Sequence, residues 1–395
     1  MVSVTNSGVL PEMSLQAGWL AWPGRRFVTE VFDGADEALA ALDSVQRDLG
    51  STGFQTLNWL TVLYEELAPS HRAMPRLVVV SDRSSGDVCL ILPLVVKMKR
   101  GLRVARFADL GVAEYGAPIL GPAAPTKRRS IRRMWRSVRA ALKDVDLIRL
   151  ESMPAEIGGR ANPLITRRGV TPARHTGYAI TVTGTVDGYL RTLGKKYRKE
   201  VERCTRLWAQ EGNPKFARAE TGEAIARGYS LLEEHQAQRQ VALGGKYVLG
   251  EQPYSAFYER IVMDGFEPEF SYLFTLEAKT DVIATLFGVV HDGTFTLLRI
   301  ANGGPAFKYM SPGRLIIVEA MKYFVARGVT RFDLGIGDQN FKRRLGAKEV
   351  PLYDLFIARD LKAYPKAAFH RFKGRLRQNM RLRATARDLK AKVKR

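Results

Sequence analysis

The chain has 395 residues, of which 46% are hydrophobic and 9% aromatic, so two folded domains are expected and a disordered chain is excluded. Its formal net charge of +22 favours polyanionic partners, such as phosphate-rich cofactors, nucleic acid or an anionic membrane face, without choosing among them. It contains no apolar run of transmembrane length and no recognisable secretory signal, and Cys89 and Cys204 lie far apart, which predicts a cytoplasmic protein with reduced thiols.

The first half of the chain mixes helices and strands. Residues 1–27 have little periodicity and predict a loose N-terminal arm. Helical spacing then predicts helices over 36–49, over a stretch led by Phe54, Leu57, Trp59, Leu60 and Leu63, and over a basic segment at 128–142. Short β-rich runs predict strands at 77–81, 88–97, 104–107 and 146–150, with a Gly/Pro-punctuated loop at 113–122. We therefore expect a first mixed domain over 28–175.

A second domain is expected over 176–360, because the chain is irregular near 159–177 and regular again beyond it. Residues 187–210, 223–240 and 254–263 are predicted helices, and 215–219 a short strand. Three apolar strands are predicted at 271–277, 282–290 and 294–300, and Asp292-Gly293 is a strong hairpin signal between the last two. The first half shows a degraded form of the same order, so two similar halves are a hypothesis.

The stretch from Ser311 to Lys342 predicts a buried helix, a strand at 329–334 and a glycine-bearing polar loop. Ser311 suits an N-cap, and the following Pro312 suits the first helical position. Because a helix N-terminus presents unpaired N–H groups that favour an anion, we predict that this end binds the anionic part of a cofactor. The residues assigned to cofactor binding are Lys308, Ser311, Gly313 and Arg314.

Candidate catalytic groups are few. His235 suits a general base because its ordinary pKa is near neutral; a structural or solvated histidine is the alternative, and the more common one for such a position. Asp338 follows two glycines beyond a strand end, where it would orient an amine, hold Lys342 or simply stabilise a turn. His291 lies in a predicted hairpin turn and is expected to be solvated. None of the five histidines has metal-ligand spacing, so no metal site is predicted.

The last segment, 361–395, carries 13 Lys or Arg residues and one acid. It is helix-prone, with one apolar face formed by Phe369, Phe372, Leu376 and Met380, and Gly374 weakens the helix. We predict a basic helical tail that contacts an anionic membrane peripherally; a solvated basic tail is the alternative.

The order of three antiparallel strands, helix and strand resembles the core of the GNAT acetyltransferase fold. More closely, the chain resembles the CelD/BcsL-like acetyltransferase family, which is related to the FemAB-type tandem-domain transferases. The segments that carry the resemblance are Phe54–Trp59, Tyr178–Ile180, Lys196–Lys199, His235 with Arg239, Ser311–Gly313 and Phe332–Lys342. The usual pyrophosphate signature of this fold is Gln or Arg, two residues, Gly, one residue, then Gly or Ala. The corresponding segment here, Lys308 to Gly313, matches that signature only at its last position, Gly313.

This resemblance implies an α+β protein with two tandem acetyltransferase-like domains, each a mostly antiparallel sheet flanked by helices, the second one catalytic. The implied reaction moves an acyl group from acyl-CoA to an amine or hydroxyl of a small molecule or glycan precursor, in exopolysaccharide or cell-envelope metabolism. His235 and Asp338 would be catalytic, and Arg239 and Lys342 would bind substrate. The alternatives are a FemAB-like transferase using aminoacyl-tRNA, or a non-enzymatic basic module that binds membrane or nucleic acid.

Overall fold

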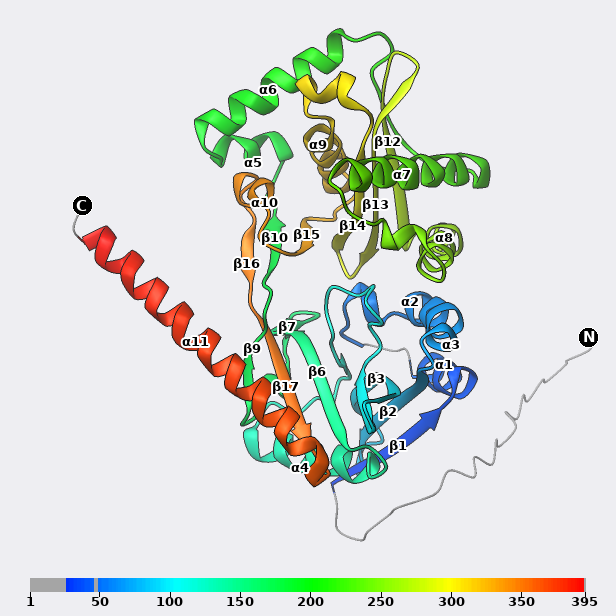
Figure 1. Cartoon of the computed structure of the whole chain (residues 1–395), viewed down its shortest axis with the longest axis vertical. Helices are drawn as coiled ribbons and strands as arrows, with labels where there is room; N and C mark the ends of the chain where they lie inside the picture. The colour runs from blue at the N-terminus through cyan, green and yellow to red at the C-terminus, as the bar shows by residue number, and fades with distance from the viewer. Residues whose placement is uncertain (1–25, 46–48, 394–395) are drawn as a thin grey trace, which may run out of the picture.

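The computed structural model describes residues 26–45 and 49–393, with side chains as far as residue 379. Figure 1 shows two lobes, each built on one β-sheet with helices against it. This arrangement confirms the predicted α+β fold class with two mostly antiparallel sheets. In the described part of the chain, no helix is both long and apolar enough to cross a bilayer.

The first sheet has the order β1-β2-β3-β4-β6-β17-β9, with β5 beside β3. All of its neighbouring strands are antiparallel except β4 and β6, which run parallel and are connected through helix α4. The bounds are β1 Phe27–Asp33, β2 Met74–Asp82, β3 Val88–Lys99, β4 Leu102–Phe107, β5 Ile119–Leu120, α4 Arg128–Ala141, β6 Leu147–Pro154, β9 Val170–Pro172 and β17 Leu352–Ala358.

Helix α4 buries Ile131, Met134, Trp135 and Val138, which recur at helical spacing, while its arginines face solvent. Other short helices pack around the first sheet: α1 Ala35–Ser44, η1 Gly53–Gln55, α2 Leu57–Val62, η2 Leu63–Leu67 and α3 Ala68–Ser70. The expected helix 36–49 therefore ends earlier, and residues 46–48 lie outside the described residues. Most of the expected N-terminal arm also lies outside them, but Phe27 already belongs to β1.

The second sheet has the order β11-β12-β13-β14-β15-β10-β16. Here β14 and β15 are the parallel pair, connected through helix α9, and the other neighbours are antiparallel. The bounds are β10 Gly177–Thr181, β11 Lys215–Arg218, β12 Ser271–Ala278, β13 Asp281–His291, β14 Thr294–Asn302, α9 Pro312–Val325, β15 Arg331–Ile336 and β16 Lys348–Val350. The three predicted strands of the meander are confirmed, including the turn at Asp292-Gly293, where both residues have positive φ.

The two sheets repeat one plan: four antiparallel strands, a helix and a strand parallel to the fourth. This confirms the hypothesis of two similar halves. In each sheet, however, the strand beyond the parallel one comes from another part of the chain. In the second sheet it is β10, which follows the first lobe in sequence, and in the first sheet it is β17, which follows the second lobe.

The expected second domain, 176–360, therefore includes at its C-terminal end a strand that belongs to the first sheet. The chain passes from the first sheet to the second between β9 and β10, and it returns between β16 and β17. Residues 352–358, expected in the second domain, pair with β6 and β9 of the first sheet. Local sequence pattern cannot show this, because strand pairing is a contact between residues distant in sequence.

The predicted helix over 187–210 is wrong in one respect, since it is two helices: α5 Val186–Thr192 and α6 Lys195–Gln210. Leu193 and Gly194 between them have extended backbone angles, and Leu193 packs on the second core. Glycine is a weak helix former, so the break falls where continuing the helix contributes least. The remaining helices, α7 Gly222–Ala242 and α8 Tyr254–Asp264, agree with prediction.

One hydrophobic core joins the two lobes. Phe54 and Trp59 of the first lobe belong to the same buried cluster as Phe257 and Phe287 of the second. The Trp59 ring meets Phe54 and Phe257 edge to face, with centroids 5.0 and 5.1 Å apart. Since a continuous core resists sliding of its parts, the lobes form one packed unit.

Helix α11, Tyr364–Val393, lies along the first lobe (Figure 1) and confirms the predicted helical tail. It packs on β17 and β9, and its small residue Ala367 is fully buried. Gly374 is also buried, and a Cβ placed there would lie 2.2 Å from Thr171 Oγ1 and 2.4 Å from Thr171 Cβ on β9. Gly374 thus permits close contact between the helix and the sheet.

We predict that Gly374→Ala destabilises the protein, although helix propensity alone favours alanine by about 0.5–1 kcal/mol. The new methyl group meets Thr171, and such overpacking costs about 1–3 kcal/mol. Denaturant unfolding measures the difference, with exposed Arg375→Ala as a control on the same helix. Adding Thr171→Gly should recover part of the loss. A gain in stability for Gly374→Ala would contradict the close contact.

Candidate functional site

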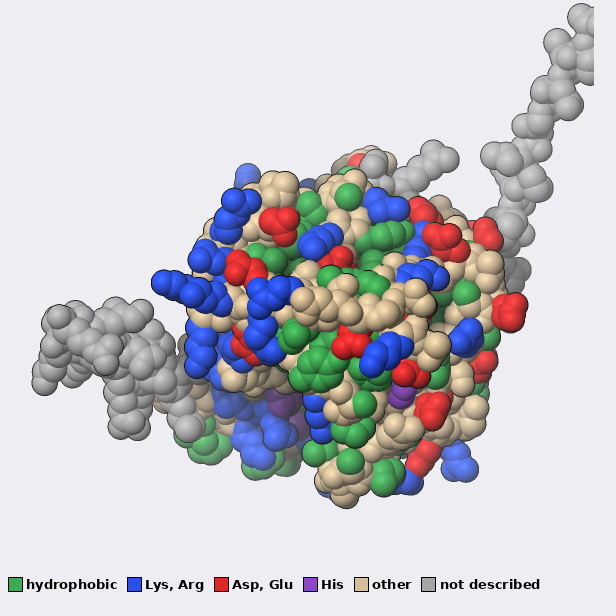
Figure 2. All heavy atoms as spheres, turned by 90° about the horizontal axis from the view of Figure 1, so that it is seen from above, with side chains coloured by type: hydrophobic (Ala, Val, Ile, Leu, Met, Phe, Trp, Pro, Cys, Tyr) green, Lys and Arg blue, Asp and Glu red, His purple; other side chains and the backbone are tan. Residues whose placement is uncertain are grey.

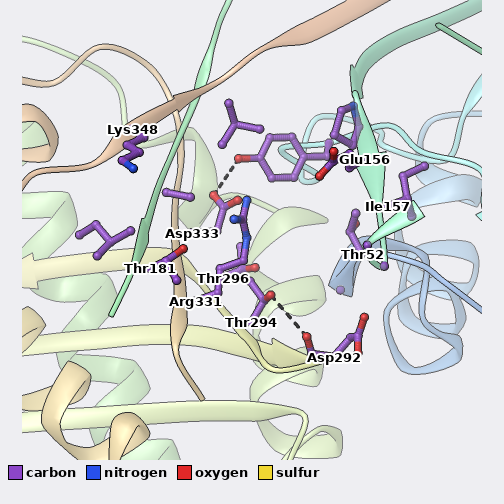
Figure 3. A pocket seen from close by; sticks show the side chains of 18 of the residues that line it. Thr52, Glu156, Ile157, Thr181, Asp292, Thr294, Thr296, Arg331, Asp333 and Lys348 are labelled. Atoms are coloured by element: carbon purple, nitrogen blue, oxygen red, sulfur yellow. Dashed lines mark hydrogen bonds between the residues drawn. The ribbon is translucent and has the colours of Figure 1, made fainter. Parts of the chain in front are cut away.

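A cavity of about 690 Å³ lies where the two lobes meet. The second sheet contributes the beginnings of β14 and β15 together with β10 and β16. The first lobe contributes Tyr115, residues 51–53 and residues 154–159, which include the short strand β7, Glu156–Ile157. Figure 3 shows Thr52, Glu156 and Ile157 of the first lobe on one side, with Thr181, Arg331 and Lys348 of the second on the other. The cavity is therefore lined by both halves of the chain.

One face of the second sheet gives the cavity a polar wall. Thr294 and Thr296 of β14 are in register with Arg331 and Asp333 of β15, and all four line the cavity. The alternate residues, such as Phe332, belong to the core beneath α9 on the other face. This polar and apolar alternation follows from the two-residue period of a strand.

The cavity is acidic relative to the rest of the protein. Its lining includes the carboxylates of Glu156, Asp292, Asp333 and Glu349, against two permanent cations, Arg331 and Lys348. The chain as a whole carries a net charge of +22. A local excess of carboxylates favours a group that is cationic or becomes cationic, such as an amine.

Asp333 joins the lobes at this cavity. Tyr115, from the first lobe, donates its hydroxyl to Asp333 Oδ1 over 2.7 Å, and the Gly335 N–H donates to the same oxygen over 2.8 Å. Asp333 is 5% exposed, and burial raises the pKa of its carboxyl. Burial and the adjacent Asp333 also raise the pKa of the Tyr115 phenol, which therefore remains a donor.

The parallel strands β14 and β15 separate just beyond this pair. Their register ends at Thr296 and Asp333, although both strands continue. On its other edge, β14 pairs with β13 through a bulge: Phe287 faces Arg299 and Gly288 faces Leu297, which leaves Leu298 unpaired. A bulge turns a strand away from its neighbour, so Leu298 lies where the gap between β14 and β15 opens.

Glu114 of the first lobe reaches β15 at this gap. Its Oε2 accepts the Ile336 N–H over 2.6 Å, and its carboxyl lies against Gly335, where a Cβ would be 3.1 Å from Glu114 Cδ. Gly335 has φ +75°, a conformation that glycine adopts at little cost. Burial raises the pKa of Glu114 despite the Ile336 hydrogen bond and the charge of Lys342, which act in the opposite direction.

Lys342, predicted to bind substrate, is 3% exposed. Its Nζ donates to the Gly335 carbonyl over 3.0 Å and to the Ile336 carbonyl over 2.9 Å, so it holds the glycine loop. Burial lowers the pKa of its ammonium group, and the nearby charges of Glu114 and Asp333 oppose that shift. Buried Asp333 and Lys342, with partly buried Glu114, thus form a cluster of three ionisable side chains beside the gap.

The predicted pair His235 and Asp338 lies on separate elements. His235 is on α7, which packs against β12, β13 and β14; its Nδ1 is buried without a hydrogen-bond partner, and burial lowers its pKa. Asp338 is exposed beyond β15, where it accepts from Tyr178 over 3.2 Å and pairs with Arg343 over 3.2 Å. Neither residue lines the 690 Å³ cavity.

Arg239, the other predicted substrate-binding residue, lies at a smaller cavity of about 270 Å³ on the surface of α7. Lys246, Tyr247 and Ile300 also line this cavity, and Ile300 comes from the part of β14 beyond the bulge. Gln236 donates to the Ile300 carbonyl over 3.1 Å, which fixes α7 to this end of β14.

The predicted cofactor-binding residues gather around the start of α9. Lys308 is exposed in η5, Pro305–Met310, directly before the helix. Ser311 occupies the N-cap position with φ 51°, but its side chain makes no capping hydrogen bond, contrary to expectation. Gly313 lies against Asn302 at the end of β14, while Arg314 pairs with Glu200 over 2.9 Å.

Helix α6 brings further positive charge to this end of the second lobe. Lys195, Lys196, Lys199 and Arg203 are exposed on it, and Arg203 donates to the Tyr309 carbonyl in η5 over 3.2 Å. Figure 2 shows Lys and Arg side chains gathered on the side of the molecule where α6 lies. The positive charge and the start of α9 therefore belong to one surface.

His291 corrects an expectation. It was expected to be solvated in a hairpin turn, but it lines the cavity and is only partly exposed. Its Nε2 lies 2.8 Å from Ser51 Oγ of the first lobe, and burial lowers its pKa. The hairpin points into the contact between the lobes, which local turn signals cannot show.

Sequence reasoning missed Glu114, Tyr115 and Asp333. The first two fall in a segment predicted as loop, and no local periodicity marks them. Asp333 lies inside the Phe332–Lys342 block, but the two glycines of that block direct attention to Asp338, which follows them. One signal in the sequence could have identified Asp333. It lies in a predicted strand between the apolar residues Phe332 and Leu334, and a carboxylate buried in a strand needs a hydrogen-bonding partner. In the described part of the chain, no group of three or more His, Cys, Asp or Glu residues is placed to hold a metal ion.

Comparison with known proteins identifies a domain in the second half. Residues 195–343 match the family described as the Acetyltransferase (GNAT) domain. This match covers α6 to α10 (Asn340–Arg344) and supports a transferase. No curated protein sequence matches the chain. The narrower assignment to the CelD/BcsL-like family remains a prediction.

Solved structures resemble the whole fold. FemX aligns with 82% of this chain and 96% of its own, at TM-score 0.54 and 12% identity. The C-terminal domain (DUF2156) of a protein from Agrobacterium fabrum, named as a lysylphosphatidylglycerol synthetase, aligns with 85% and 95%, at TM-score 0.50 and 11% identity. A protein of unknown function from Bacteroides thetaiotaomicron aligns with 81% and 97%, at TM-score 0.50 and 11% identity. At these identities the likeness concerns the fold.

We predict that Asp333→Ala lowers the free energy of unfolding by about 1–3 kcal/mol, because the Tyr115 hydroxyl loses its acceptor. Asp333→Asn should keep both hydrogen bonds through its carbonyl oxygen. The raised pKa means that folding favours the protonated acid, so the wild-type contribution is present below the ordinary carboxyl pKa and declines as pH rises through the folded value. The advantage of Asp333→Asn over wild type should therefore grow across that window. Denaturant unfolding at several pH values measures both effects, and a pH-independent difference would count against a buried Asp333.

Proposed function

We propose that the protein transfers an acyl group from a donor held at the gap between β14 and β15 to an amine bound in the cavity between the lobes. The observation that supports this most directly is the position of Glu114. Its carboxylate contacts β15 where the two strands separate, and Tyr115, the next residue, lines the acid-rich cavity. Glu114 thus lies between the gap proposed to hold the donor and the cavity proposed to hold the acceptor.

The donor is proposed to be acyl-CoA, with its phosphates at the start of α9. This end presents helix N–H groups, the exposed Lys308 and the basic side chains of α6, all of which favour an anion. Gly313 keeps the first turn close to Asn302 at the end of β14, so the helix starts beside the strand that borders the gap. Arg314 is engaged by Glu200 and would hold α6 against α9.

The chemistry is attack of a neutral amine on the carbonyl of a thioester. The amine loses a proton, the carbonyl carbon becomes tetrahedral, and the thiolate leaves with a proton. Glu114 would accept the amine proton, since a carboxylate with a raised pKa is a stronger base at neutral pH. A backbone N–H of β14, within Thr294–Ile300, would polarise the thioester carbonyl.

The acceptor is proposed to be an amine of a glycan precursor, in exopolysaccharide or cell-envelope metabolism. The size of the cavity, about 690 Å³, suits a small molecule rather than a polymer chain. Its threonines and carboxylates offer hydrogen-bond acceptors to hydroxyl groups and a favourable field for an amine. The second lobe would then carry the donor, and both lobes would hold the acceptor.

A second candidate donor is aminoacyl-tRNA. The observation that favours it is the exposed basic face of α6, which spans a helix of 16 residues beside the start of α9. A nucleotide cofactor needs few phosphate contacts, whereas an RNA backbone uses many. The transferred aminoacyl group would occupy the same gap, so the two donors predict different salt dependence.

We predict that Glu114→Gln lowers turnover by about 10²–10⁴-fold while donor affinity is kept, because the amide preserves the Ile336 hydrogen bond but cannot accept a proton. Thiol release from acetyl-CoA with a panel of amino sugars measures turnover. His235→Ala in the same assay tests the base predicted from the sequence. If His235→Ala alone abolishes turnover, the assignment of Glu114 fails.

The pH profile gives a second readout for Glu114. Its pKa is raised, so the base should become protonated, and turnover should fall, at a higher pH than for an ordinary carboxylate. The acidic limb should disappear in Glu114→Gln. An unchanged acidic limb in that variant would show that another group titrates.

We predict that the triple variant Lys195→Gln, Lys196→Gln, Lys199→Gln weakens binding of the true donor. If the donor is tRNA, the slope of log affinity against log salt should fall by about one for each lost phosphate contact. If the donor is acyl-CoA, salt dependence should be shallow and the loss small. Arg129→Gln, Arg132→Gln, Arg133→Gln on α4 is the matched control, and equal losses in both triples would indicate a nonspecific charge effect.

A further inference from the structure

The strongest feature outside the site is a row of solvent-facing apolar side chains on α11 and on the short helix η6, Leu361–Ala363, directly before it. Of thirteen large hydrophobic side chains exposed in the described residues, five lie within residues 361–376. They are Leu361 (87% exposed), Tyr364 (58%), Phe369 (54%), Phe372 (60%) and Leu376 (46%). We call these five side chains the apolar row.

The row cannot be part of the protein core. The opposite face of α11 packs on β17 and β9, with Ala367 and Gly374 buried there, and Ala363 at the end of the preceding η6 is buried as well. Arg377 strengthens that contact, since it donates to the Pro172 carbonyl over 3.3 Å. Because the helix is fixed by its buried face, Phe369, Phe372 and Leu376 are held on the outside, three to four residues apart.

Positive charge surrounds the row. Exposed Lys362, Lys373 and Arg375 lie on the same stretch, and residues 361–379 contain no Asp or Glu. The turn between β3 and β4 brings exposed Lys99 and Arg100 to the start of α11. Burial, followed by the charges of Lys99, Arg149 and Arg100, lowers the pKa of Lys366. The cations around the apolar row therefore repel one another, and an anionic partner would relieve that repulsion.

Helix α4 is not part of this surface, because it packs on the other face of the first sheet. Its buried residues share a cluster with Ala105 and Ile148, whereas Ala363 and Ala367 pack with the alternate residues Val104 and Leu147. The apolar row and its cations therefore belong to the face of the first lobe that α11 covers.

We propose that this surface binds the protein to an anionic lipid bilayer, with the apolar row inserted at the interface and the cations against lipid phosphates. Burial of apolar area and attraction to anionic lipid are the two forces that hold an amphipathic helix on a membrane. A second copy of the chain is a poorer occupant, because two such surfaces would bring like charges together. The helix lies on the bilayer, since its length beyond the row is basic rather than apolar.

The test uses the full chain and co-sedimentation with vesicles of phosphatidylcholine mixed with phosphatidylglycerol. Wild type should bind these vesicles, release them as salt rises, and bind phosphatidylcholine vesicles weakly. Phe369→Ser, Phe372→Ser, Leu376→Ser should lower the partition coefficient by at least about tenfold, since each aromatic or leucine side chain contributes apolar burial. Lys366→Gln, Lys373→Gln, Arg375→Gln should lower it by up to about fivefold per charge on anionic vesicles only.

The matched control is Val241→Ser, Leu243→Ser, Val248→Ser, which removes equally exposed apolar side chains from the second lobe. Circular dichroism and thermal unfolding establish that each variant is folded. Vesicle binding that is unchanged in the α11 apolar variant would overturn the proposal, and so would an equal loss in the control. Concentration-dependent dimers that disappear in the α11 variant, without any vesicle binding, would instead assign the row to a second copy. Acyl transfer to a soluble amine is measured separately, so the two proposals fail independently.

Discussion

The arrangement of the whole molecule depends on two crossings of the chain between its sheets. After β9 the chain leaves the first sheet and enters the second as β10, and after β16 it returns to the first as β17. Each sheet therefore contains one strand, β10 or β17, that directly follows a strand of the other sheet in the chain. Separating the lobes would strain both crossings and expose the shared core around Trp59. The two crossings and the shared core thus fix the lobes that enclose the cavity.

This constraint makes the buried charges at the lobe contact tolerable. Asp333 and Glu114 are costly to bury, and each is compensated by hydrogen bonds that cross from one lobe to the other. Such bonds need donors placed within tenths of an ångström, which only fixed lobes provide. The first lobe is consequently a component of the site, because it supplies Glu114 and Tyr115, whereas the sequence alone suggested that the second domain would act by itself.

Local signals in the sequence were enough for much of the second sheet. The meander from Ser271 to Asn302 combines alternating apolar residues with turn residues that require positive φ, and both are read over a few positions. The fold class followed from the order of these elements. Strands β1, β10 and β17 carry weaker patterns, and their places depend on pairing with residues far along the chain. The exchange of β10 and β17 could not be predicted for the same reason.

The site was harder to predict, because its groups act through partners on other elements. Glu114 lies in a stretch whose prolines and glycines indicate a loop, and only its contact with Ile336 distinguishes it. Asp338 and Lys342 had more suggestive positions in the sequence. The structure places the first at the surface beside Arg343 and uses the second to hold the carbonyls of Gly335 and Ile336.

The place of β17 also affects how the chain must fold as it is made. Between β6 and β9 the first sheet has a vacant position that only residues 352–358 fill, so the N-terminal lobe cannot complete its sheet while the ribosome is still translating the second. Until then both strands present unpaired N–H and C=O groups, which invite pairing with other chains. Domains usually fold in order of synthesis, but here the first lobe is finished last. A nascent chain of this protein therefore needs protection for nearly its whole synthesis, and truncation before β17 removes a strand from the lobe that was made first.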